Sequence, residues 1–225
     1  MFRLYFFDKL SSTNDKAKEF NAGSVVVTKQ QTTGRGRFRR RWHSGIGGIY
    51  CSIVTKSFEA NYLTIIAAIS AQKAIKKTCN IQTTIKWPND LLCENKKICG
   101  ILTCTGQEKA IIGIGINTNN DIPASLRNKA TSLNMICKKN IDNGLLIKNL
   151  LEYFDYYLAL LGKGKKSMIL TSWKKCSFLG KKIIVKTRKS RYAGIAYGID
   201  KDCFLMLKED NGRIRRIIEG DIFVN

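Results

Sequence analysis

The chain has 225 residues, of which 44% are hydrophobic and 25% are charged, and it contains only two prolines. This composition is typical of a globular protein and excludes collagen, coiled coil and bulk disorder. The 39 Lys and Arg residues outnumber the 17 Asp and Glu residues, and the net charge of +22 predicts anionic partners: nucleic acid, acidic proteins or small anions. The longest apolar run is far below the roughly 20 residues that cross a bilayer, so we expect no membrane partner.

The eight cysteines bear on the redox compartment. The N-terminal segment lacks an apolar core of signal-peptide length, so the sequence predicts a cytoplasmic protein whose cysteines are ordinary buried thiols. No pair is spaced Cys-x-x-Cys and His43 is the one histidine, which disfavours a Cys/His zinc site.

The first three quarters of the chain alternate between strand-like runs and amphipathic helices, which indicates an α/β or α+β sheet protein. A short helix is expected to begin at Ser12 or Thr13, a long helix to span 61–79 with Asn61 as its cap, and a second long helix to span 144–161. Strands are expected at 3–7, 24–30, 47–56, 84–86, 97–103 and 110–116.

From about Cys176 the pattern changes to short β segments, at 181–187, 192–200, 203–209 and 213–224. The dipeptide Asn211-Gly212 between two alternating runs is a strong hairpin signal. We therefore expect two domains, 1–177 and an all-β domain at 178–225.

An arginine-rich segment, Thr32–Trp42, carries five arginines within residues 35–41, inside a stretch (20–58) without an acidic residue. Glycines at 34 and 36 allow close approach of a ligand to the backbone, and guanidinium groups match phosphate oxygens, so a phosphate or an adenylate is the expected ligand. A solvated basic loop or a nucleic-acid patch remains the alternative.

A second segment, Ile85–Leu91, reads IKWPNDL and is followed by KKICGIL at 96–102. The Asp90 carboxylate beside basic residues could hold Mg²⁺ while the lysines neutralise a substrate anion. The alternative is a plain Pro-Asn-Asp turn.

Two further segments are weaker signals. Residues 111–119, IIGIGINTN, contain a GxG, but without a strand-turn-helix context a buried strand ending in a polar Asn fits better than a dinucleotide loop. Residues 11–15, SSTND, are typical of a helix N-cap and could also bind a small ligand.

Taken in order, the motifs STN, QxxGRGR, KWPNDL, KxxGIL and GxGIN closely resemble the biotin protein ligase (biotin–[acetyl-CoA-carboxylase] ligase) family. The resemblance covers nearly the whole chain, because the tail from Gly180 is similar to the small C-terminal domain of that family. It implies an α+β fold: a mixed-sheet catalytic domain flanked by helices, of the class II synthetase-like or biotin/lipoate ligase type, plus an SH3-like β-barrel. It also implies the monofunctional type, without a DNA-binding domain, as a monomer or weak homodimer.

The resemblance implies a two-step ATP-dependent reaction. Biotin and ATP give biotinyl-5′-AMP and pyrophosphate, and the biotinyl group then passes to one lysine of a biotin carboxyl carrier domain of a carboxylase. Mg²⁺ is expected to bridge the phosphates near Asp90, with Asn89 beside it. No covalent enzyme nucleophile is needed.

The motif match assigns residue roles. The residues implied in biotin binding are Ser12, Thr13, Asn14, Gln31, Arg35, Gly36, Arg37 and Lys97. Those implied at ATP or the adenylate are Arg35, Arg37, Arg40, Trp42, Lys86, Asn89, Asp90 and Asn117. The catalytic cations implied are Lys97, Arg35 and Arg37.

One position departs from the family pattern, since Arg39 stands where the glycine-rich loop usually has a glycine, which predicts altered loop closure and adenylate retention.

Lipoate and octanoate ligases share the fold and are the nearest alternative, although KWPND with GRGR argues against them. A nucleic-acid-binding protein is the alternative from another class, and it leaves KWPND and GIGIN unexplained.

Overall fold

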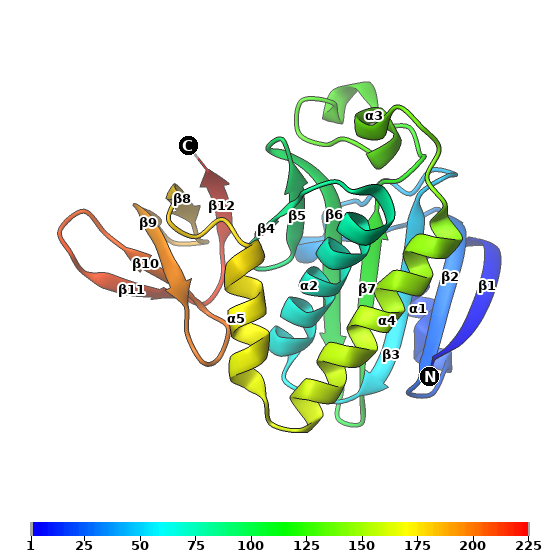
Figure 1. Cartoon of the computed structure of the whole chain (residues 1–225), viewed down its shortest axis with the longest axis horizontal. Helices are drawn as coiled ribbons and strands as arrows, with labels where there is room; N and C mark the ends of the chain where they lie inside the picture. Colours follow the sequence, from blue (N-terminus) through cyan, green and yellow to red (C-terminus); the bar gives the residue numbers. More distant parts are fainter. Residues whose placement is uncertain (1, 225) are drawn as a thin grey trace.

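A computed structural model describes residues 2–224. Its larger sheet has seven strands in the order β1-β2-β3-β7-β6-β5-β4 (Figure 1). Strands β1 and β2 are parallel and the other neighbouring pairs are antiparallel, which confirms the predicted mixed sheet. The bounds are β1 (Arg3–Leu10), β2 (Ser24–Gln31), β3 (Ile49–Lys56), β4 (Thr84–Lys86), β5 (Asp90–Cys93), β6 (Lys96–Thr105) and β7 (Lys109–Ile116).

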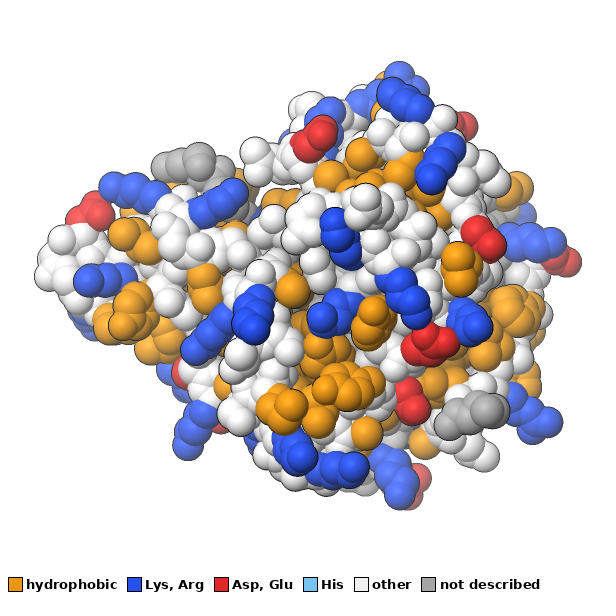
Figure 2. Space-filling view, viewed as in Figure 1, with side chains coloured by type: hydrophobic (Ala, Val, Ile, Leu, Met, Phe, Trp, Pro, Cys, Tyr) orange, Lys and Arg blue, Asp and Glu red, His pale blue; other side chains and the backbone are white. Residues whose placement is uncertain are grey.

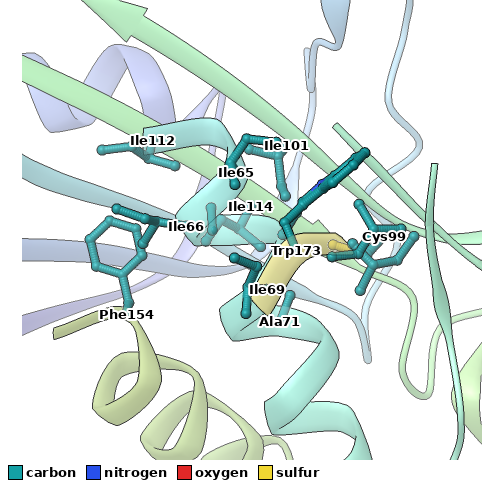
Figure 3. Packing of buried hydrophobic residues seen from close by; sticks show 14 of the residues in the cluster. Ile65, Ile66, Ile69, Ala71, Cys99, Ile101, Ile112, Ile114, Phe154 and Trp173 are labelled. Carbon is teal, nitrogen blue, oxygen red and sulfur yellow. The ribbon is translucent and has the colours of Figure 1, made fainter. Parts of the chain in front are cut away.

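Three helices, α2 (Ala60–Cys79), α4 (Asn143–Gly162) and α5 (Lys166–Cys176), cover one face of this sheet (Figure 1). Figure 3 shows the core between them, where isoleucines of α2 meet β7 and Phe154 of α4. Helix α4 begins after Asp142, whose carboxylate accepts a hydrogen bond from Leu145 N at 2.9 Å, as a helix N-cap does. Helix α1 (Thr13–Lys16) lies behind the sheet in this view, and α3 (Leu133–Cys137) lies beyond its upper end.

The second sheet has five antiparallel strands in the order β11-β10-β9-β8-β12. They are β8 (Lys182–Lys186), β9 (Arg191–Ile199), β10 (Leu205–Lys208), β11 (Ile214–Ile217) and β12 (Asp221–Val224). The hairpin predicted at Asn211-Gly212 joins β10 to β11, and Gly212 has a φ of 83°. The strand content is that of the expected SH3-like domain, but the described ladder is open, with β11 and β12 as its edges, rather than a closed barrel.

Several local predictions need correction. Asn61 does not cap α2: it lies in the first turn, and its Nδ2 donates to Asp202 O at 3.0 Å. Strand β5, α3 and α5 were not expected. The β5–β6 turn is formed by Glu94 and Asn95, both with positive φ (49° and 60°). It lacks the glycine that usually marks such a turn in a sequence.

The smaller sheet is attached to the larger one through the turn that joins β9 to β10. Trp87 Nε1 donates to Cys203 O at 2.9 Å in a buried position, and Tyr62 Oη donates to Lys201 O at 2.5 Å. Trp87 belongs to the segment that leads to Asn89 and Asp90, so the same few residues contact the second sheet and the site described below.

The excess of positive charge is spread over the surface. Figure 2 shows Lys and Arg side chains distributed over the face that carries α2, α4 and α5, with few acidic groups between them. Within the described chain, no helix is long and apolar enough to cross a membrane.

Candidate functional site

A pocket of about 260 Å³ opens on the face of the large sheet opposite α2. Side chains alternate along β7, so Ile112, Ile114 and Ile116 join the core while Gly113 and Gly115 face the pocket. The lining extends from Gly113 to Asn117, which is about 13 Å along the chain at the rise of a strand. The expected buried strand at 110–116 is therefore present, and its glycines make room above the sheet.

Except for Lys86, every residue predicted for the site lines this pocket. They come from α1, the end of β2, the arginine-rich loop, the β4–β5 turn, β6 and the end of β7. Lys86 lies on β4, beside the pocket, where Asp90, Lys97 and Arg40 influence its charge.

One end of the pocket is a polar network built on the start of α1. Ser12 caps this helix, its hydroxyl accepting from Asp15 N at 3.4 Å. Gln31 Oε1 accepts from Thr13 N at 2.8 Å and from Thr13 Oγ1 at 3.1 Å, and Gln31 Nε2 donates to Ser44 Oγ at 2.8 Å. The hydroxyl and amide groups at this end are thus oriented by each other before any ligand arrives.

Asn14 lies directly above Gly113. A Cβ at Gly113 would lie 2.9 Å from Asn14 Cγ, which real Cβ atoms do not tolerate. Asn14 Nδ2 donates to Leu102 O at 3.3 Å, and Ser52 Oγ lies 2.6 Å from Asn14 Oδ1 and 2.8 Å from Thr13 Oγ1. Glycine at 113 is what allows this amide to lie flat against the sheet.

The indole of Trp42 lies over Gly100 and Gly115, which pair across β6 and β7. A Cβ would approach the ring to 3.0 Å at Gly100 and to 2.5 Å at Gly115. We call Gly100, Gly113 and Gly115 the glycine floor. Trp42 Nε1 is buried and has no hydrogen-bond partner in the described chain, so it can donate to a ligand.

Two lysines and one carboxylate lie close together at the middle of the pocket. Lys97 Nζ lies 2.7 Å from Asp90 Oδ1 and 5.2 Å from the centre of the Trp42 ring. Lys86 is partly buried, and burial lowers the pKa of its ammonium, an effect that the nearby Asp90 partly offsets. The position of the two ammonium groups suits a bound anion.

The arginine-rich loop folds back over the pocket. Gly36 N donates to Arg40 O at 2.7 Å, and the tight turn between them places Phe38 and Arg39 at φ values of 55° and 59°. This left-handed conformation is free for glycine and unfavourable for Arg39, which explains physically why a glycine suits this position.

The arginines of this loop differ in their partners. Arg35 pairs with Asp15, at the outer side of the pocket. Arg37 Nη1 donates to Asn89 Oδ1 at 3.3 Å, and burial lowers the pKa of its guanidinium. Arg40 binds Asp221, its Nη1 donating to Oδ1 at 3.0 Å and its Nη2 contacting Oδ2. Two of the predicted phosphate ligands are therefore held from two different parts of the chain.

Asn117, at the far end, is almost completely buried. Its Nδ2 donates to Thr131 O at 3.1 Å and its Oδ1 accepts from Asn120 Nδ2 at 3.3 Å. Half of the hydrogen-bonding capacity of the amide remains, so one N–H and one lone pair are left for a ligand. The side chain thus also anchors the loop that closes this end.

The donor set does not form a metal site by itself. Among residues 2–224 no group of three or more His, Cys, Asp or Glu side chains could hold an ion. Asp90 pairs with Lys97, and Asn89 Oδ1 accepts from Arg37. This arrangement fits a magnesium ion that arrives on phosphate groups and takes one carboxylate from the protein, which is how proteins commonly hold it.

Several residues that line the pocket or lie next to its lining were not predicted. Ile122, Leu126 and Ala130 form an apolar wall at the Asn117 end, in a segment with no motif and little regular structure. Ser52, which bonds Thr13 and Asn14 beneath the polar end, was missed because it reads as an ordinary strand residue. Asp221 lies far along the chain from the other lining residues, and the sequence carries no signal that the second sheet reaches the pocket.

The eight cysteines, all within the described residues, are free thiols. The expectation of buried thiols holds for Cys51, Cys93, Cys99 and Cys203. It is wrong for Cys104, which is exposed, and Cys79, Cys137 and Cys176 are only partly buried. None of the eight lines the pocket.

Comparison with known proteins gives two family matches. Residues 6–119 match the Biotin/lipoate A/B protein ligase family, and residues 178–224 match the Biotin protein ligase C terminal domain. The bifunctional ligase/repressor BirA of Bacillus subtilis is 36% identical over 239 residues, covering 97% of this chain and 73% of the relative. The biotin–[acetyl-CoA-carboxylase] ligase of Paracoccus denitrificans is 28% identical, covering 91% and 94%.

Among solved structures, the biotin protein ligase of Aquifex aeolicus in complex with biotin and ATP superposes with a TM-score of 0.91. It is 26% identical, and the superposition covers 99% of this chain and 98% of that one. A biotin protein ligase of Leishmania major in complex with biotinyl-5-AMP gives a TM-score of 0.69 at 21% identity, a likeness of fold.

Proposed function

Because the chain belongs to the Biotin/lipoate A/B protein ligase family, we propose that the pocket above the glycine floor is where it joins biotin to ATP and then transfers biotin to a protein. The chain is an ATP-dependent biotin protein ligase. It converts biotin and ATP into biotinyl-5′-AMP and pyrophosphate, and passes the biotinyl group to a lysine of a biotin-dependent carboxylase. The observation that carries the site assignment is the gathering of Arg37, Arg40, Lys86 and Lys97 around one pocket with a neutral polar network at its other end.

In the first step a carboxylate oxygen of biotin attacks the α-phosphorus of ATP, and the bond to the pyrophosphate oxygen breaks. Both reactants are anions, so the approach requires cations that are already in place. Lys97 lies at the centre of the pocket, between Asp90 and the Trp42 ring, and we assign it to the biotin carboxylate and the attacked phosphate. Arg37 and Arg40 cover the phosphates from the loop.

The neutral end of the pocket suits the ureido ring of biotin, which offers two N–H donors and one carbonyl acceptor. Ser12, Thr13, Asn14 and Gln31 supply hydroxyl and amide groups there. Since Thr13 and Gln31 already bond each other, their orientation is fixed before binding, and little ordering is needed when the ring enters. We assign the glycine floor and Trp42 to the apolar part of biotin.

The other end is assigned to the adenosine. Asn117 keeps one N–H and one lone pair for the base edge, and Ile122, Leu126 and Ala130 supply an apolar wall. A predominantly apolar lining with a few oriented polar groups is typical of small-ligand sites.

We place Mg²⁺ at Asp90, with Asn89 nearby, as a partner of the ATP phosphates. When bound, the ion would neutralise part of the phosphate charge. For this chain, the pairing of Asp90 with Lys97 implies that the carboxylate is shared between a lysine and the ion.

In the second step the amine of the acceptor lysine attacks the acyl carbon of the adenylate, AMP departs and the amine loses a proton. The mixed anhydride is already activated, so the enzyme mainly positions the amine and excludes water. We take a biotin carboxyl carrier domain to be the acceptor, and the basic surface to favour capture of acidic carriers.

Exchange of labelled pyrophosphate into ATP tests the first step directly. Biotin should support exchange, whereas lipoate and the absence of any acid should not. Lys97→Ala should abolish it, and Lys96→Ala is the matched control, since Lys96 is exposed and does not line the pocket. Exchange with lipoate would contradict the substrate, and equal losses in both variants would contradict the role of Lys97.

A further inference from the structure

One side chain of the smaller sheet reaches the pocket. Asp221 is the first residue of β12, and among the described residues that line the pocket it alone comes from the C-terminal five-stranded sheet. The cations that it faces all lie in the larger part of the chain, so it is a candidate for a role in the reaction that the motifs do not indicate.

Asp221 holds Arg40 with both carboxylate oxygens. Arg40 Nη1 donates to Oδ1 at 3.0 Å and Nη2 contacts Oδ2, the two-point geometry that fixes the plane of a guanidinium. The hydrogen bond from Arg40 lowers the pKa of the Asp221 carboxyl, and Arg37 and Lys86 add to this effect. The carboxylate is therefore charged at neutral pH and faces three cations of the proposed phosphate site.

This pair is not needed to hold the fold together. The Arg40 side chain is 61% exposed, and ion pairs at such exposure contribute little to stability. Its effect is on geometry, because Arg40 ends a tight loop whose backbone is closed by the hydrogen bond from Gly36. Apart from Asp221, the guanidinium contacts only the Phe38 ring of the same loop among the interactions of the described residues, at 5.5 Å from the ring centre, and that contact does not fix its plane.

Two N–H groups of the guanidinium bond Asp221, which leaves three for another acceptor. Arg37 has a single hydrogen bond to the Asn89 amide, at 3.3 Å. Without Asp221, the remaining carboxylate near Arg40 would be Asp90, which already pairs with Lys97. Repulsion from Arg37 and Lys86 would then favour Arg40 rotamers that point away from the pocket.

We propose that Asp221 is a positioning residue for the ATP-dependent step, by which the smaller sheet keeps Arg40 directed at the phosphates of the nucleotide. This inference rests on the proposed function, in which Arg40 binds phosphate. Without the carboxylate, the Arg40 side chain becomes ordered only when ATP binds. The entropy cost of that ordering weakens ATP binding by between about twofold and tenfold. Biotin binding, at the opposite end, is unaffected.

The test is pyrophosphate exchange with each substrate varied in turn, on the full chain. Asp221→Asn is expected to raise the KM for ATP by that factor, with the KM for biotin and the midpoint of urea unfolding unchanged. Asp221→Glu should restore part of the loss. The matched control is Asp210→Asn, because Asp210 pairs with Lys182 at 3.5 Å and lies outside the pocket.

An unchanged KM for ATP in Asp221→Asn would overturn the inference, because the carboxylate would then have no effect on ATP binding. A lowered KM would also overturn it, because the carboxylate would then compete with phosphate for Arg40. Arg40→Ala separates this from failure of the proposed function. If Arg40→Ala leaves the KM for ATP unchanged, the assignment of Arg40 to phosphate is wrong. If Arg40→Ala raises it, Asp221→Asn should add nothing further in the double variant, and an additive effect would refute positioning through Arg40.

Discussion

The substitution Gly113→Ala tests the role of the glycine floor. The new Cβ would lie 2.9 Å from Asn14 Cγ, so the Asn14 amide must leave its position. It would lose the hydrogen bond to Leu102 O, at 3.3 Å, and the one from Ser52 Oγ, at 2.6 Å. At about 1 kcal/mol for each hydrogen bond, the free energy of unfolding should fall by about 2 kcal/mol.

The same displacement removes the Asn14 amide from the proposed biotin end. One hydrogen bond to the ligand, about 1 kcal/mol, is then lost, so the KM for biotin should rise about fivefold. Urea unfolding and biotin-dependent pyrophosphate exchange measure the two effects. Gly198→Ala is the control, because Gly198 is also in a strand, β9, and a Cβ there meets no atom within 4 Å.

The expected effect comes from one collision, which a double variant can check. In an Asn14→Ala background the new methyl group meets no amide, so Gly113→Ala should have little additional effect on stability. Equal effects of Gly113→Ala in the two backgrounds would refute the collision as the cause, as would unchanged stability and biotin KM in the single variant.

Three further outcomes are expected. Ser52→Ala should raise the KM for biotin in pyrophosphate exchange, because the Ser52 hydroxyl that contacts Thr13 and Asn14 is lost. Ser70→Ala is the control, since it removes only a hydrogen bond within its own helix, and it should leave this KM unchanged. Equal effects of the two substitutions would show general destabilisation. Lys86→Met should raise the stability to urea at pH 7, because burial lowers the pKa of this ammonium and its charge therefore opposes folding. The gain should disappear once the pH passes the pKa of lysine in the unfolded chain, about 10.4. A gain that does not depend on pH would contradict this origin. Arg39→Gly should stabilise the chain by about 1 kcal/mol in urea unfolding, since φ at Arg39 is 59°, and no gain would show that the loop relaxes instead.

Much of the fold could be predicted because local signals agreed with the final structure. The alternation of Ile and Gly in residues 111–116 places isoleucines in the core and glycines toward the pocket, and Asn211-Gly212 forms the expected hairpin. The expected site residues, which are far apart in the sequence, gather in one pocket because their strands are neighbours in the sheet.

What could not be predicted depends on contacts between distant segments. The turn at Glu94 and Asn95 adopts positive φ without glycine, so β5 gave no local signal. Asn61 was expected as a cap, but its amide bonds Asp202 in the turn between β9 and β10, a partner that helix patterns cannot reveal. Asp221 enters the pocket only through the packing of the two sheets.

The indole of Trp87 is a buried link between the two sheets, which also share one hydrophobic core. Its Nε1 is bonded to Cys203 O, and its chain continues through Pro88 and Asn89 to Asp90, which pairs with Lys97. A rigid-body swing of the smaller sheet would break this buried bond and shift the segment that carries Asp90. We therefore expect the two sheets to melt in a single cooperative transition, and a protease that cuts between them to find its site only in the unfolded chain.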